Sequence, residues 1–140
     1  MRVLISKNRS SLETDDGFFT ITRQAFHLNV DTNDFVCRKV RDIEHVFSVD
    51  WFDEGEPLHF HPPICFIKNG KIKFINGRHR TELLLKYLEK IPVIFLSHKA
   101  SAFSSVDEQL KIKEMIERIC EPLKSGTSFN FPELPLRKFS

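Results

Sequence analysis

The stretch that most constrains the fold runs from Ile64 to Leu96 and contains, in order, signals for a hairpin, a helix and a strand. Its first part, ICFIKNGKIKFI, has two short apolar segments joined by Asn69-Gly70. This dipeptide favours the type I′ turn, because both central residues of that turn need a positive φ. The segment therefore predicts a β-hairpin.

After the hairpin, the same stretch predicts a helix and another strand. Apolar residues recur at helical spacing after the hairpin. These residues are Leu83, Leu84, Tyr87 and Leu88. Ile91-Pro92 ends the helix, and the β-branched and aromatic run from Val93 to Leu96 has the length of a strand. A strand, a helix and a strand in so few residues predict a βαβ crossover with a right-handed connection and parallel strands.

Outside this stretch, the sequence predicts strands over residues 2–6 and 18–28, a helix from Thr32 and a loop over residues 50–63. The apolar stripe of the helix from Thr32 consists of Val36, Val40, Ile43 and Phe47. Together with the βαβ unit, these elements indicate an α/β fold. We expect a small mixed sheet with a central βαβ unit and flanking helices.

A last helix is predicted to begin at Ser105, because Ser105 and Glu108 have the spacing of a capping box. Its apolar stripe consists of Ile112, Met115, Ile116, Ile119 and Leu123. The 140 residues suit one hydrophobic core. We expect an α/β nucleotide- or phosphate-binding domain at residues 1–124 and an extended, phenylalanine-rich arm at residues 125–140. The arm is expected to lie across the domain; the alternative is a peptide that docks on a partner.

Composition restricts the classes of function. The formal net charge of +2 is too small to attract nucleic acid over the whole surface, so polyanion binding would require a local cluster. Cys37, Cys65 and Cys120 form no C-x-x-C pair, which predicts buried thiols in a reducing compartment. Because the sequence has no leader and no apolar run long enough to cross a bilayer, we expect a cytoplasmic protein without membrane insertion.

The candidate binding site is the turn Gly77-Arg78-His79-Arg80, at the point where the second hairpin strand gives way to the helix. The first amides of a helix lack acceptors within the helix, and the helix dipole adds partial positive charge. Gly77 permits a tight turn, and both arginines suit phosphate or carboxylate oxygens. His79 adds a donor or a titratable group. The turn therefore predicts an anion site for phosphate.

Asn76 and Thr81 flank this turn and are expected to form hydrogen bonds at its rim. The alternative is that both arginines solvate the start of the helix and pair with Glu82 or Asp53. A lone phosphate would bind to the anion site only weakly. A nucleotide or a nucleic-acid strand would need further contacts elsewhere.

The histidines and carboxylates before the hairpin are secondary candidates. His59 and His61 would share one face of an extended segment, either at the rim of the pocket or as Zn²⁺ ligands with Cys65 or His79. If Cys65 is not a Zn²⁺ ligand, we expect it to lie in the hydrophobic core.

The acidic loop before the hairpin could supply a metal ligand. Asp53 and Glu54 could hold Mg²⁺ that bridges the phosphates of ATP or another nucleotide. The alternative is a solvated loop.

The stretch from Glu56 to Leu96 resembles the ParB/sulfiredoxin-like superfamily. Gly77 and Arg80 fall on the Gly-x-x-Arg phosphate turn of that superfamily, and Ile91-Pro92-Val93 falls on the strand that follows its helix. The resemblance implies a small α/β domain that binds nucleotide phosphates at this turn.

Two branches of the superfamily differ from this chain. Sulfiredoxins carry a cysteine directly after the glycine, where this chain has Arg78, so sulfinic acid reduction is not expected. Chromosome-partitioning members have Gly-Glu-Arg-Arg and then a helix-turn-helix region, for which too little chain follows.

The turn NGRHRT is more similar to the turn of the single-domain plasmid fertility inhibition factors. That resemblance implies a weak ATPase or DNase that inhibits conjugative DNA transfer, with His79 and Arg80 as catalytic residues. The implied partners are a nucleotide or nucleic acid and a protein of the transfer machinery. The alternative is a non-catalytic interaction protein with a vestigial phosphate pocket and a partner-binding tail.

Overall fold

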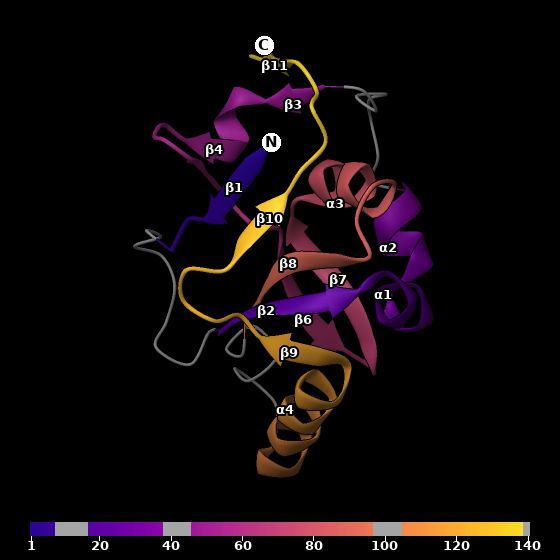
Figure 1. Cartoon of the computed structure of the whole chain (residues 1–140). Helices are drawn as coiled ribbons and strands as arrows, with labels where there is room; N and C mark the ends of the chain where they lie inside the picture. Colours follow the sequence, from indigo (N-terminus) through magenta and orange to yellow (C-terminus); the bar gives the residue numbers. More distant parts are fainter. Residues whose placement is uncertain (8–16, 38–45, 97–104, 139–140) are drawn as a thin grey trace.

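A five-stranded sheet forms the centre of the computed structural model, which describes residues 1–7, 17–37, 46–96 and 105–138 (Figure 1). Within these residues the chain is mixed α/β. The strands of the sheet are, in spatial order, β7 (Lys71–Asn76), β6 (Ile64–Lys68), β8 (Lys90–Phe95), β2 (Gly17–Thr22) and β9 (Cys120–Pro122). The predicted hairpin is confirmed: Asn69 and Gly70 connect β6 and β7 with φ values of +54° and +72°.

The predicted parallel βαβ unit is wrong. Strand β8 lies beside β6 and parallel to it, with Ile64 opposite Ile94, whereas β7 pairs antiparallel with β6. Strands β7 and β8 therefore run in opposite directions, with β6 between them. The burial of the two strands explains the order. Residues 91–95 of β8 are all buried and need a neighbour on each side, whereas β7 alternates between buried and exposed positions and suits an edge.

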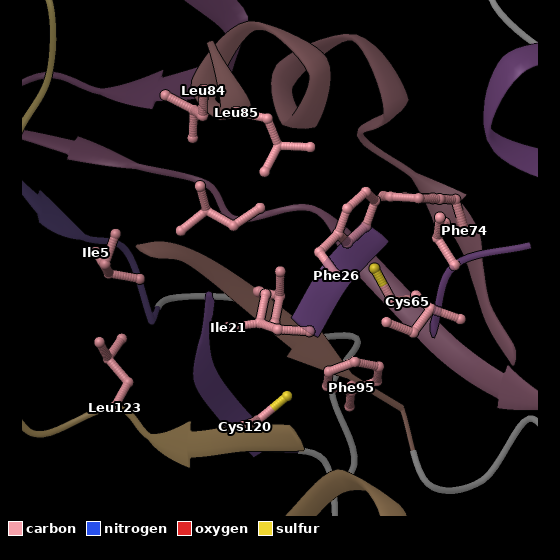
Figure 2. Packing of buried hydrophobic residues seen from close by; sticks show 14 of the residues in the cluster. Ile5, Ile21, Phe26, Cys65, Phe74, Leu84, Leu85, Phe95, Cys120 and Leu123 are labelled. Carbon is pink, nitrogen blue, oxygen red and sulfur yellow. The ribbon is translucent and has the colours of Figure 1, made fainter. Parts of the chain in front are cut away.

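Helix α3 (Arg78–Leu85) connects β7 to β8, as predicted. The leucines Leu83, Leu84 and Leu85 are buried, whereas Tyr87 lies beyond the helix and is exposed. Figure 2 shows Leu84 and Leu85 above the sheet core, which also contains Cys65 and Cys120. The strand after α3 begins at Lys90, earlier than predicted, and includes Pro92.

The predicted strand over residues 18–28 is wrong after Thr22. Strand β2 ends there, and helix α1 (Arg23–Asn29) begins, with the Thr22 hydroxyl accepting a hydrogen bond from the Ala25 amide. This side-chain cap satisfies an amide that has no acceptor within the helix. In the sequence, the apolar alternation of β2 favoured a longer strand, so Thr22 was not recognised as a helix cap.

Helix α2 (Thr32–Cys37) begins at the predicted residue. Val40 and Ile43 of its predicted stripe lie outside the described residues. Phe47 is not helical: it is buried in β3 (Phe47–Ser48) and contacts other aromatic rings instead. The helical spacing of Phe47 from Ile43 was therefore misleading.

Two strands of a second sheet lie within residues 50–63, which were predicted to form a loop. The strands of this sheet are, in order, β10 (Ser128–Asn130), β1 (Arg2–Ile5), β5 (Leu58–Phe60) and β4 (Phe52–Asp53). Strand β5 is parallel to β1, and a 3-10 helix (Val49–Trp51) precedes β4. The loop prediction failed because strands of two or three residues leave no periodicity to detect, although Phe60 is fully buried.

Helix α4 (Val106–Ile119) begins as predicted, because the Ser105 hydroxyl accepts a hydrogen bond from the Glu108 amide. Met115 and Ile116 of the predicted stripe are buried. The chain then leaves the helix for β9 before it reaches Leu123.

The C-terminal arm is built into the fold. Strand β10 pairs antiparallel with β1, and β11 (Leu136–Arg137) pairs parallel with β3 (Figure 1). Between them, Phe131 is 2% exposed, and its ring centroid lies 4.9 Å from that of Phe60 and 5.8 Å from that of Phe47. Residues 125–138 thus supply two strands and a core side chain to the domain expected at residues 1–124.

Candidate functional site

Gly77 is the N-cap of α3 and adopts a left-handed conformation with a φ of +99°. A Cβ at this position would lie 2.5 Å from the Cβ of Pro63 and 2.7 Å from Nη2 of Arg80. The site therefore needs glycine for two reasons: the backbone angle, and the close packing against Pro63. Both reasons are internal to the fold.

Arg78, predicted to bind an anion, is engaged by the fold. Its Nη2 lies 3.0 Å from Oδ1 of Asp34, and its Nε donates to the Asp34 carbonyl at 2.9 Å. Nη2 also donates to the Phe74 carbonyl, and both charged side chains are 15% exposed. Arg78 therefore ties α2 to β7. Pairing with a carboxylate was foreseen, but with Glu82 or Asp53 rather than with Asp34.

Arg80 is buried beneath the start of α3, with 7% of its surface exposed. Its Nη2 donates to Oδ1 of Asn76 at 2.6 Å, and its Nη1 donates to the carbonyl of His61 at 3.2 Å. The guanidinium therefore has a fixed position between the end of β7 and the segment that leads into β6. It places a positive charge beside the helix terminus.

The remaining residues of the turn differ in position. His79 is half-buried. Thr81 is fully buried and donates its hydroxyl hydrogen to the carbonyl of Gly77 at 2.8 Å, so it does not lie at a rim. Helix α3 lies entirely within the described residues, and it has no side-chain cap and no acidic residue in its first turn. The first turn therefore supplies no carboxylate to the positive end of the helix dipole.

A second polar group extends from this turn through His61. The Nε2 atom of His61 lies 2.9 Å from Oδ1 of Asp53, and the hydroxyl of buried Ser6 donates to Oδ2 of Asp53 at 2.6 Å. The Ser6 hydroxyl is the largest cause that lowers the pKa of the Asp53 carboxyl, and the neighbouring imidazole of His61 adds to this effect. Asp53, His61 and Arg80 are thus brought together, as neighbours in one network.

The metal-site predictions gain no support from the geometry of the described residues. Asp53 uses one oxygen for Ser6 and the other for His61, and Glu54 is exposed. The described part of the chain has no group of three histidine, cysteine or carboxylate side chains arranged to hold a metal. Cys65 is buried in β6, as expected, and burial raises the pKa of its thiol.

His59 is the register partner of Asp53 in the pairing of β4 with β5, but it also lines a separate cavity. The end of β1 and residues 123–127 line this cavity with His59, and no residue of α3 lines it. The predicted pair of histidines is therefore divided between two places, His61 beside Arg80 and His59 in the cavity.

Two partners of the predicted site residues were missed in the sequence. One is Asp34, the partner of Arg78, whose charge was a signal that it could pair with an arginine. Ser6 gave no signal, because a serine at the end of a strand is common at any surface.

Comparison of the chain with protein-family models, with curated proteins and with solved structures found no match. Among the described helices, none has both the length and the apolar character needed to span a bilayer.

Proposed function

We propose that this chain binds a phosphate group, free or carried by a nucleotide, at the start of α3. The observation that carries the proposal is the position of Arg80, whose guanidinium is fixed beside a helix terminus that has neither a side-chain cap nor an acidic first turn. A helix dipole and a positive charge at one place favour an anion. His79 lies half-buried in the same first turn.

The expected affinity is low. The helix terminus contributes about 0.3–1 kcal/mol, and each charge-assisted hydrogen bond contributes about 1.5–3 kcal/mol. Because Arg78 is engaged with Asp34, we count one or two such bonds, which gives about 2–7 kcal/mol in total. Inorganic phosphate would then bind more weakly than micromolar, and a nucleotide would need contacts outside the turn.

Hydrolysis of the nucleotide and inhibition of conjugative DNA transfer extend this proposal and come from the resemblance to the fertility inhibition factors. In this extension His79 acts as the general acid or base. Because Asp53 is bonded to Ser6 and His61, any Mg²⁺ would enter with the nucleotide phosphates rather than be held by Asp53 and Glu54.

Phosphate binding is tested by titrating the ¹⁵N-labelled protein with inorganic phosphate and following its amide resonances. We expect saturable shifts for the amides of residues 78–80. The start of α4 is an internal control, because the Ser105 hydroxyl caps it and its first turn contains Asp107 and Glu108. Shifts of equal size at both helix starts, or none at residues 78–80, would contradict the proposal.

Hydrolysis is tested by phosphate release from ATP in the presence of Mg²⁺. The variant His79→Ala should lose the activity, whereas His27→Ala, which changes an exposed histidine on α1, should retain it. Equal rates for both variants and the unchanged protein would exclude a catalytic role for His79.

A second candidate is a non-catalytic protein that inhibits DNA transfer through a partner. The observation that favours it is the use of Arg78 and Thr81 within the fold, because both were expected to bind phosphate. The deciding measurement is a conjugation assay in cells that express the protein. Inhibition that persists in His79→Ala, together with an absence of phosphate binding, would support this candidate.

A further inference from the structure

A cavity of about 280 Å³ opens on the side of the second sheet, at the end of β1. Three separate segments meet there: the end of β1, strand β5 and the turn after β9. Its lining residues are Leu4, Ile5, Lys7, His59, Leu123, Lys124, Ser125, Gly126 and Thr127. The cavity contains no residue of the α3 turn, so it is separate from the site of the proposed function.

The charge of this cavity is one-sided. Lys7 and Lys124 line it together with His59, and no described lining residue is acidic. Neither lysine forms an ion pair with a carboxylate of the described residues. The whole chain has a formal net charge of +2, so two lysines in one small cavity form a strong local concentration of positive charge.

Lys7, which follows β1, lies over an aromatic ring beside the turn. The Nζ atom of Lys7 lies 5.4 Å from the centroid of the Phe18 ring, a distance at which the ring attracts a cation. The carbonyl of the same Phe18 accepts a hydrogen bond from the amide of Leu123, at the start of the turn. Phe18 thus brings the Lys7 ammonium to the turn that contains Lys124.

Hydrogen bonds within the chain close the turn formed by residues 124–127. The Thr127 amide and hydroxyl both donate to the carbonyl of Lys124, at 3.2 and 2.7 Å. Gly126 has a φ of +80°, as the third residue of a type II turn requires. These bonds fix the Lys124 backbone and leave the hydroxyl of Ser125 without a hydrogen-bond partner among the described residues.

Size and charge together select the ligand. Clefts that bind drug-sized ligands measure about 300–1,000 Å³, so the volume of this cavity, just below that range, suits a small anion. Ammonium, imidazole and hydroxyl donors come from three segments, which matches a tetrahedral anion with oxygens in several directions better than a planar carboxylate. We propose that this cavity is a second anion site, which binds inorganic phosphate or the phosphate of a small phosphomonoester.

The test uses the ¹⁵N-labelled full chain and three probes: inorganic phosphate, methyl phosphate and acetate. Inorganic phosphate should cause saturable shifts at the amides of residues 125–127. Equal affinity for methyl phosphate would identify an esterified phosphate as a ligand, and a loss of affinity would identify the free ion. Acetate that binds as tightly as phosphate would overturn the proposal.

Matched double variants separate a built site from general charge attraction. Lys7→Gln with Lys124→Gln should weaken phosphate binding at residues 125–127 by about tenfold or more, because two charge-assisted contacts are lost. Lys68→Gln with Lys71→Gln removes the same charge from the exposed ends of the hairpin and should leave the affinity unchanged. Equal loss in both double variants, or shifts that never saturate, would refute the site. Shifts at residues 78–80 report the α3 site separately, so either site can fail alone.

Discussion

The guanidinium of Arg78 and the carboxylate of Asp34 form a pair that is mostly buried, with Nη2 of the arginine 3.0 Å from Oδ1 of the aspartate. The second oxygen of Asp34 accepts the amide hydrogen of Phe74, so the pair joins the start of α2 to β7. Sequence alone placed Arg78 in an anion site. The structure places a carboxylate of the protein itself against that guanidinium.

The first prediction concerns this pair. Arg78→Ala or Asp34→Ala should each lower the free energy of unfolding by about 2–4 kcal/mol, because each leaves a mostly buried charge without its partner. In a double-mutant cycle measured by urea denaturation, the two changes should be strongly non-additive. If Arg78→Ala kept its stability but lost phosphate binding, the arginine would be a ligand and this interpretation would be wrong.

The second prediction concerns Gly77. Gly77→Ala should lower the free energy of unfolding by about 2–4 kcal/mol, because it combines a left-handed backbone with a Cβ that meets the Pro63 ring. Gly70→Ala is the matched control. Its φ is also positive, at +72°, but an added Cβ meets nothing within 4 Å, so the cost should be limited to about 1 kcal/mol. Equal losses in urea denaturation would show that Pro63 can move away.

The third prediction concerns the C-terminal arm. Phe131→Ala should lower the free energy of unfolding by about 3–5 kcal/mol, because the ring fills the space between Phe47 and Phe60. Leu136→Ala, at a position 40% exposed on the same arm, should cost less than about 1 kcal/mol. A Phe131→Ala protein of unchanged stability would indicate that the arm is instead available to dock on a partner.

The fourth prediction concerns pH. The pKa of the Asp53 carboxyl lies below its ordinary value of 3.8 in the folded protein, chiefly because of the Ser6 hydroxyl. The stabilisation from this carboxylate is therefore fully present above that value and is lost as the pH falls through the folded pKa. The difference in unfolding free energy between the unchanged protein and Asp53→Asn should shrink as the pH falls from about 5 to about 2.

Ser6→Ala provides the control for this pH dependence. It removes the largest cause of the lowered pKa but leaves His61 in contact with the carboxylate. The loss of stability in acid should then occur at a higher pH than in the unchanged protein. An acid transition identical in both proteins would show that the hydrogen bond between Ser6 and Asp53 does not set it.

Local signals predicted the fold where one or two residues decide the backbone. Asn69-Gly70 determines a tight turn by its φ angles, and Ser105 determines a helix start by its cap, so both were found correctly. The order of the strands was not predictable in this way. It depends on the full burial of β8, which requires neighbours that the local sequence does not name.

The candidate site was predicted less well, for a related reason. Residue types at the α3 turn indicated positive charge correctly, but the partner of each charge comes from a distant segment. Asp34 lies 44 residues before Arg78, and the His61 carbonyl lies 19 residues before Arg80. A short motif carries no information on such contacts, so it cannot separate an arginine that binds a ligand from one that holds the fold together.

The pairing of β10 with β1 also determines when this protein can finish folding. The first strand, Arg2–Ile5, pairs with β5 along one edge. Its other edge stays unpaired until residues 128–130 are present to form β10. On the ribosome, the aromatic core around Phe60 therefore stays open until Phe131 has emerged from the exit tunnel. Such long-range closure slows folding, and apolar surface that stays exposed in the meantime favours aggregation.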